Sequence, residues 1–276
     1  MKLTLGFSPC PNDTYIFDAL IQRKVDTEGL EFDYFMADVE QLNGEAFSEK
    51  PDVTKLSFHT FMHLAGTYLL LDSGAALGFG AGPLVVSKNL NHFEELAGKT
   101  VGIPGIYTTA NLLFSLAMKE SVHKKEMLFS DIENAILSGE IDAGVIIHES
   151  RFTYQSKGLH KLMDLGEYWE RLTGSPVPLG GIAAHKRLGN DVIAKVERSI
   201  RRSVEFANAH KGELNEFIRC NAQEMDDAVM QKHIDLYVNE FSVSLGLQGK
   251  QAVNQMFEYA LSAGVITKIP DCIFAS

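Results

Sequence analysis

The chain of 276 residues is long enough for one large domain or for two smaller ones, each with its own core. Hydrophobic residues make up 45% and charged residues 22%, an ordinary globular composition that excludes a disordered or fibrous protein. The net charge is −11, and the basic residues are scattered except for Arg198, Arg201 and Arg202, which argues against nucleic-acid binding.

The cysteines and the apolar runs predict where the protein is located. Cys10, Cys220 and Cys272 are odd in number and far apart, so we expect a reducing compartment and no disulfide framework. The apolar stretch at the N-terminus is too short for a signal peptide, and no run approaches the roughly 18 apolar residues of a membrane span. We therefore expect a cytoplasmic protein without membrane contact, and its oligomeric state stays open.

In the first third of the chain, strand-like and helix-like segments alternate, which is typical of an α/β fold on a largely parallel sheet. Residues 2–7 are predicted to form a strand, and Asn12 or Asp13 is placed to cap a helix over residues 14–23. The following segments are predicted as a strand over 30–36, a helix over 39–48, a strand over 52–57, a helix over 58–67 capped by Ser57, and extended chain with glycine bends over 69–87.

Residues 78–83, GFGAGP, resemble a nucleotide-binding loop only superficially. A dinucleotide loop must open a helix, whereas this one is followed by Pro83 and the strand-like LVV, so we exclude that function. Further on we predict helices over 93–96, 109–121, 131–138, 190–209, 222–240 and 251–263, and strands over 100–103 and up to His148; the helix over 190–209 carries an apolar stripe of Val192, Val196, Ile200 and Val204.

The alternation restarts after residue 86, and the Gly/Pro-rich stretch 173–181 is a candidate for a second crossing. We therefore predict two α/β lobes, one of residues 1–86 with 182–276 and a smaller one of residues 87–181. Such a pair fits the periplasmic-binding-protein type II architecture, with a central cleft and a helical C-terminal segment.

His148 is the candidate for chemistry. It follows the buried-looking run Val145–Ile147, and ligands of open α/β sheets collect beyond the carboxyl ends of strands. A core histidine satisfied by backbone groups is the alternative, and the residues alone leave both open. Glu149 should face away from His148 if the strand continues, which leaves Arg151 and Tyr154 as neighbours that could reach the base or the ligand.

Two further places could hold an anionic ligand. Lys55 and Ser57 share one face of a strand and could contact a carboxylate, although a solvated Lys and a capping Ser are the simpler interpretation. Thr108 and Thr109 precede an apolar helix, whose first N–H groups can hold an anion. A threonine N-cap without a ligand is a common alternative, but an acidic protein that binds an anion needs a local site of this kind.

Two other groups are assigned no chemistry. We expect Cys10 to line a pocket or to fill space, because no partner histidine is identifiable. His59 and His63 lie four residues apart but lack the glutamate of an HExxH motif, so we expect no metal.

The motifs SPCPNDTYIFDAL, PGIYTTANLL, GVIIHESRFTYQSKGL and LGEYWERLTGSPVPLGG together resemble the 1,4-dihydroxy-6-naphthoate synthases of the futalosine route to menaquinone, over residues 3 to about 187. The resemblance implies a lyase that converts cyclic dehypoxanthinyl futalosine, a small carboxylate, to 1,4-dihydroxy-6-naphthoate and dihydroxyacetone without a cofactor. It implies His148 as general base and Lys55, Leu56, Ser57, Thr109 and Ala110 as substrate contacts. Chorismate dehydration in the same pathway and non-catalytic binding of a small molecule are the alternatives.

Overall fold

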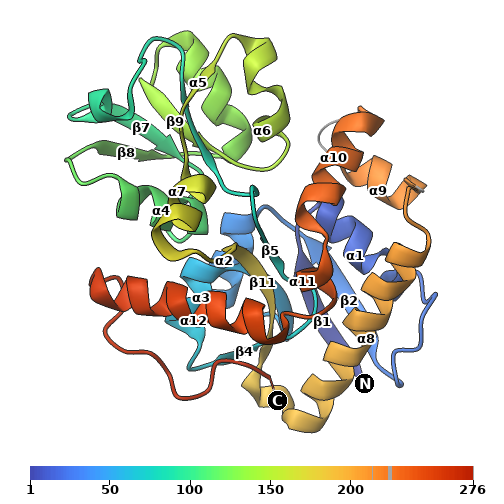
Figure 1. The fold of residues 1–276 in the computed structure, drawn as a ribbon. Helices are drawn as coiled ribbons and strands as arrows, with labels where there is room; N and C mark the ends of the chain where they lie inside the picture. Colours follow the sequence, from blue (N-terminus) through green and yellow to red (C-terminus); the bar gives the residue numbers. More distant parts are fainter. Residues whose placement is uncertain (213, 223–225, 276) are drawn as a thin grey trace. The chain divides into compact units, whose positions relative to one another are not determined.

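The computed structural model describes residues 1–212, 214–222 and 226–275, and the chain divides into two compact units (Figure 1). Unit 1 is Met1–Gly78 with Pro178–Ser276, and unit 2 is Phe79–Val177. The chain passes between the units at Gly78–Phe79 and at Val177–Pro178, earlier in each case than the crossings predicted near Val86 and Gly181, which lie in β6 (Leu84–Ser87) and β11 (Val177–His185). No helix in the described ranges has the length and apolar composition needed to cross a bilayer.

The sheet of unit 1 has the strand order β2-β1-β3-β11-β4, with β5 paired to β11. β1 runs parallel to β2 and β3, whereas β11 is antiparallel to β3 and β4. The elements are β1 (Lys2–Phe7), α1 (Pro11–Ile21), β2 (Glu31–Met36), α2 (Val39–Phe47), β3 (Val53–Ser57), α3 (Phe58–Leu64), β4 (Tyr68–Leu70), β5 (Ala76–Gly78), β11, the 3-10 helix η4 (Lys186–Leu188), α8 (Asn190–Ala209), α9 (Glu216–Asn221), α10 (Asp227–Tyr237), α11 (Glu240–Val243) and α12 (Gly246–Ser262).

Helices cover both faces of this sheet. Leu3, Leu5 and Phe7 of β1 belong to one buried cluster with residues of α1 and α8, because alternate strand residues face the same side. Gly6 faces the other side, where a Cβ would lie 3.1 Å from Leu42 of α2. The core of unit 1 therefore lies between the sheet and two helical layers, which explains why β3 is buried along its whole length and why Leu3, Leu5 and Phe7 of β1 are buried.

The packing of α8 on α1 combines an apolar stripe with one buried hydroxyl. The predicted helix over residues 190–209 is confirmed, and Val196, Ile200 and Val204 of its stripe are fully buried. Ser203 adds what the stripe did not indicate: its Oγ donates to the Ile16 carbonyl (2.6 Å) and accepts from Leu20 N (3.0 Å). These two hydrogen bonds join the second half of α1 to α8 at a buried position.

Unit 2 has its own sheet, in the order β10-β6-β9-β7-β8. β7 runs parallel to β8 and β9, and β6 is antiparallel to β9 and β10. The elements are β6, the 3-10 helix η1 (Phe93–Leu96), β7 (Thr100–Ile103), α4 (Thr109–Ala117), β8 (His123–Glu126), η2 (Phe129–Asp131), α5 (Ile132–Ser138), β9 (Ala143–Ile146), α6 (Ser150–Thr153), η3 (Tyr154–Lys157), β10 (His160–Asp164) and α7 (Leu165–Thr173).

Glycines allow close packing in unit 2. A Cβ on Gly144 of β9 would lie 2.3 Å from Ile132 of α5, so α5 can approach the sheet closely only because Gly144 lacks a side chain. A Cβ on Gly102 of β7 would lie 2.6 Å from Ile141, which precedes β9. On the other face α4 and α7 lie side by side, and the Tyr168 hydroxyl donates to the Leu116 carbonyl (3.1 Å) (Figure 1). The sheet is thus covered on both faces, which fits the buried apolar run that leads to His148.

Several predictions of the elements are wrong in detail. Both sheets are mixed, not largely parallel, because β6 and β11 run opposite to their neighbours. The first helix begins at Pro11 with Cys10 as N-cap, and neither Asn12 nor Asp13 caps it. Helices α3 and α4 end at Leu64 and Ala117, earlier than expected; the predicted helix over 222–240 is α10 followed by the start of α11, and its residues 223–225 lie outside the described ranges.

Candidate functional site

His148 lies on a tight turn directly after the sheet of unit 2. The strand β9 ends at Ile146, two residues before the predicted end, and His148 has a backbone φ of 56°. A residue with a Cβ is strained in this left-handed region, and strained residues concentrate at functional sites. The sequence placed His148 at the end of a strand, and the structure adds that the turn directs it out of the line of the strand.

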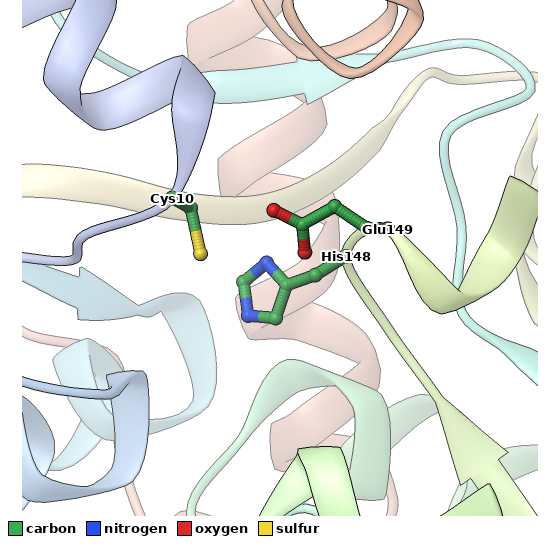
Figure 2. A group of neighbouring side chains, drawn as sticks. All are labelled: Cys10, His148 and Glu149. Carbon is green, nitrogen blue, oxygen red and sulfur yellow. The ribbon is translucent and has the colours of Figure 1, made fainter. Parts of the chain in front are cut away.

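The ring of His148 is in contact with an aromatic ring and lies near a carboxylate. Phe129 packs edge-on against the ring, with centroids 4.9 Å apart. One ring nitrogen of His148 and one carboxylate oxygen of Glu149 lie within 4.8 Å of each other, and Figure 2 shows both side chains on the same side of the turn. The expectation that Glu149 faces away is therefore wrong, because the strand does not continue and the alternation of side chains ends with it.

The helix after His148 is anchored by a buried carboxylate. Glu133 of α5 is 3% exposed, and its Oε2 accepts hydrogen bonds from Ser150 Oγ (2.9 Å) and Lys157 Nζ (2.7 Å). Ser150 begins α6, two residues after His148, so Glu133 ties both ends of the segment α6–η3 to α5. This contact limits the movement of the turn that carries the histidine.

The structure gives Arg151 and Tyr154 structural partners. The Arg151 guanidinium donates to the carbonyls of Gly80 and Gly82 and forms an ion pair with Asp164 Oδ2 (2.7 Å), while Asp164 Oδ1 caps α7. Tyr154 is 8% exposed and belongs to the apolar cluster beneath β6 and β9. Arg151 thus holds the segment that enters unit 2, and Tyr154 packs in the core.

Thr108, Thr109 and Ala110 form the beginning of α4, as predicted. Thr108 is the N-cap: its Oγ1 accepts from Asn111 N (3.2 Å) and donates to the Gly105 carbonyl (2.8 Å). Thr109 and Ala110 follow in the first turn and are buried. Nearby, burial lowers the pKa of Lys124, whose ammonium donates to Asn111 Oδ1 (2.8 Å). The first turn of α4 therefore has the N–H groups and the positive helix end that favour an anion.

Lys55 in unit 1 is not a solvated lysine. Its side chain is 8% exposed, and Nζ forms an ion pair with Asp13 Oδ1 at 2.8 Å. Because Asp13 is 1% exposed and lies in the first turn of α1, the pair joins the ends of β1 and β3. The solvated-lysine interpretation is wrong, and Asp13 is a functional candidate that sequence reasoning had treated only as a helix cap.

Ser57 ends β3 and is held by an asparagine that sequence reasoning missed. It is the N-cap of α3 but makes no side-chain capping bond. Instead Ser57 N donates to Asn43 Oδ1 (3.2 Å), and Asn43 Nδ2 donates to Ser57 Oγ (3.3 Å). Asn43 is fully buried on the apolar face of α2, between Leu42 and Ala46, and a polar residue in that stripe was the signal for it. Leu56, the third predicted contact, is buried between Lys55 and Ser57.

The other singled-out residues of unit 1 have ordinary surroundings. Cys10, also labelled in Figure 2, is 6% exposed; it is the N-cap of α1, and its N–H donates to Ser8 Oγ (3.4 Å). His59 and His63 pack ring to ring on α3, 5.4 Å between centroids, and burial lowers the pKa of His63. Among the residues that the structure describes, no third potential ligand joins these two histidines.

Two units with mixed sheets, linked by two crossings, define the class of protein: a periplasmic-binding-protein-type α/β fold. The alkanesulfonate-binding protein SsuA from Xanthomonas axonopodis pv. citri bound to MOPS has this fold, with a TM-score of 0.72 at 12% identity over 99% of this chain and 96% of that one. A solved protein from Archaeoglobus fulgidus is more similar, with a TM-score of 0.90 and 34% identity over 96% of this chain and 98% of that one.

The chain belongs to the menaquinone biosynthesis family, whose model matches residues 3–262. The 1,4-dihydroxy-6-naphthoate synthase of Thermus thermophilus is 42% identical over 99% of this chain and 98% of its own length. The enzyme of the same name from Streptomyces coelicolor is 39% identical over 98% of this chain and 97% of its own length. The match thus includes the helical tail, which the motifs had not covered.

Proposed function

We propose that the protein is a carbon–carbon lyase that converts cyclic dehypoxanthinyl futalosine to 1,4-dihydroxy-6-naphthoate and dihydroxyacetone. The observation that carries the proposal is the 42% identity, over nearly the full length of both chains, to a protein named for this synthase activity. The strained turn that presents His148 supports the proposal independently, because it places a titratable side chain beyond a strand end.

The reaction requires one base and one electron acceptor. We assign the base to His148, which takes the proton of a substrate hydroxyl. The carbon that bears this hydroxyl becomes a carbonyl as its C–C bond breaks. The electron pair of that bond passes to the ring ketone, which becomes an enolate. Imidazole has an ordinary pKa near 6.5 and can do this at neutral pH. The nearby Glu149 carboxylate favours the imidazolium that forms. Protonation and aromatisation complete the product, so the reaction needs no cofactor.

The remaining roles concern the substrate carboxylate and its oxygens. The N–H groups at the first turn of α4, with Thr109 and Ala110, are suited to hold a carboxylate or an enolate oxygen. We assign substrate contacts also to Lys55, Leu56 and Ser57, on the basis of the family motif. A cytoplasmic location fits a chain with three cysteines and no CxxC pair, and it stays a prediction.

The direct test is conversion of the cyclic futalosine derivative by the purified protein, followed by mass spectrometry of the naphthoate. We expect turnover by the wild type, none by His148→Ala or His148→Asn, and an unchanged rate for His123→Ala, an exposed histidine on β8. A wild-type kcat in His148→Ala would exclude His148 as the base. If the protein instead removes water from chorismate, it is a chorismate dehydratase. If it binds the ligand saturably without forming a product, it is a non-catalytic binding protein.

Binding at α4 is tested separately. Thr109→Val removes a hydroxyl without changing the size of the side chain, and hydrogen bonds to charged groups are worth about 1.5–3 kcal/mol. We therefore expect KM to rise about tenfold or more. Thr173→Val, at the end of α7, is the matched control. An unchanged KM in Thr109→Val would exclude this hydroxyl from the anion site.

A further inference from the structure

A buried polar cluster, consisting of Ser8, Asn12, Asp13, Lys55 and His233, lies at the start of α1. Asp13 Oδ1 accepts from Lys55 Nζ (2.8 Å) and from Asn12 Nδ2 (2.8 Å). Asp13 Oδ2 accepts from Ser8 Oγ (2.7 Å) and from Ser8 N (3.1 Å). All five residues are less than 9% exposed. Four donors therefore fill the lone pairs of one carboxylate, which leaves it a single orientation.

The cluster extends to the helical tail through a directed chain of hydrogen bonds. The Asp13 carboxylate can only accept hydrogen bonds, so the Asn12 group that faces it is the donor Nδ2. The other end of the Asn12 amide, Oδ1, then faces His233 and lies 2.9 Å from its Nε2. An amide oxygen also only accepts, and this requires that His233 carries its proton on Nε2. His233 is fully buried on α10, and 221 residues separate it from Asn12.

We infer that His233 and Asn12 are positioning residues that act through Asp13 to hold the Lys55 ammonium at the carboxyl ends of β1 and β3. A lysine side chain is flexible and carries three donors, so its direction depends on its counter-ion. Asp13 balances the charge of Lys55, and the pair therefore offers a ligand directed N–H groups without net charge. The inference rests on the proposed function, in which Lys55 contacts the substrate.

The hydrogen bonds explain the role of His233 on α10. His233 Nε2–H fixes the Asn12 amide, the amide fixes Asp13, and Asp13 fixes Lys55. Loss of this donor frees the amide to rotate, and the Asp13 carboxylate then loses one of its four donors. A glutamine at position 233 supplies an N–H in place of the imidazole, whereas a leucine supplies none.

Enzyme kinetics on His233→Leu and His233→Gln test the inference, with folding checked by circular dichroism. We expect KM for the cyclic futalosine derivative to rise about tenfold in His233→Leu with kcat changed less than twofold, and to return close to the wild-type value in His233→Gln. His185→Leu, which removes another buried histidine of unit 1, should lower the Tm and leave KM unchanged. A wild-type KM in folded His233→Leu would overturn the inference.

A double-mutant cycle separates positioning from general loss of structure. Lys55→Gln keeps an N–H for Asp13 but removes the ammonium, so in this background His233→Leu should change KM no further. An undiminished effect of His233→Leu in the Lys55→Gln background would show that His233 acts by another route and would overturn the inference.

An NMR measurement tests the hydrogen bonds of the cluster and does not require enzymatic turnover. It therefore distinguishes failure of the inference from failure of the proposed function. The ¹⁵N resonances of the Lys55 ammonium and the His233 ring should show a held ammonium and an Nε2–H tautomer in the wild type. We expect the Lys55 signal to shift in His233→Leu and to stay in His233→Gln. An unshifted Lys55 signal in His233→Leu, or an Nδ1–H tautomer in the wild type, would overturn the inference whatever the substrate.

Discussion

The left-handed backbone at His148 predicts an inverted order of stability for two substitutions. Both His148→Ala and His148→Gly remove the imidazole and its contact with Phe129, so these losses cancel when the two variants are compared. The remaining difference is the backbone. At a φ of 56° alanine keeps the steric strain of a Cβ and glycine does not.

The magnitude follows from two opposing contributions. Strain of a residue with a Cβ in the left-handed region costs roughly 1–2 kcal/mol. Glycine loses about 0.5–1 kcal/mol more backbone entropy than alanine on folding. His148→Gly should therefore unfold with a free energy about 0.5–1 kcal/mol higher than that of His148→Ala. At an ordinary helical position the order is reversed, with glycine about 1 kcal/mol less stable than alanine.

Urea unfolding followed by tryptophan fluorescence measures the difference. Trp169, the single tryptophan of the chain, is fully buried on α7 and reports on unit 2, in which His148 lies. Asn134→Ala and Asn134→Gly, on the exposed side of α5 in the same unit, are the matched control pair. His148→Gly could instead be less stable than His148→Ala by the same amount as Asn134→Gly is less stable than Asn134→Ala. In that case His148 is not strained in solution and the reasoning fails. Both His148 variants should lack turnover.

Three further predictions concern stability. Gly166→Ala should lower the free energy of unfolding by roughly 1–3 kcal/mol in the same fluorescence assay, because its Cβ would lie 2.7 Å from the Gly82 backbone; an unchanged midpoint would contradict that close approach. Gly44→Ala on α2, with no atom within 4 Å of the new Cβ, should raise it by up to about 1 kcal/mol, and a lower midpoint would contradict the open surroundings. Burial raises the pKa of Asp52, but hydrogen bonds that include those from Thr4 outweigh it and lower the pKa. Ionised Asp52 therefore stabilises the fold above its unfolded pKa of about 3.9, so the Tm difference between wild type and Asp52→Asn should shrink as pH falls below that value; a constant difference would refute this.

Elements with strong local patterns could be predicted from the sequence. The helix over residues 190–209 and the strands over 2–7 and 100–103 have the predicted bounds, because a four-residue apolar repeat and short apolar strand patterns such as KLTLGF and TVGI are local properties of the chain. The strands β8 and β10 received no prediction. β8 is the edge strand HKKE, which contains no apolar residue, so no apolar alternation marks it.

The candidate site divides in the same way. The sequence determined that His148 follows a strand and that Thr108 caps a helix, because both depend on neighbours in the chain. It could not determine the direction of Glu149, since that direction depends on a turn with positive φ at His148. Nor could it predict that Asp164 binds Arg151, since this pairing depends on how β10 lies beside β6.

By itself the sequence therefore determined the residue types available, the main helices and strands, and the family resemblance. Only the tertiary structure decided which polar groups are buried and what satisfies them: Lys55 on Asp13, Ser57 on Asn43, and His233 on Asn12. The physical reason is that a buried polar group must find a partner, and burial arises only when segments far apart in the chain pack together. The 221 residues between Asn12 and His233 carry no local signal of that contact.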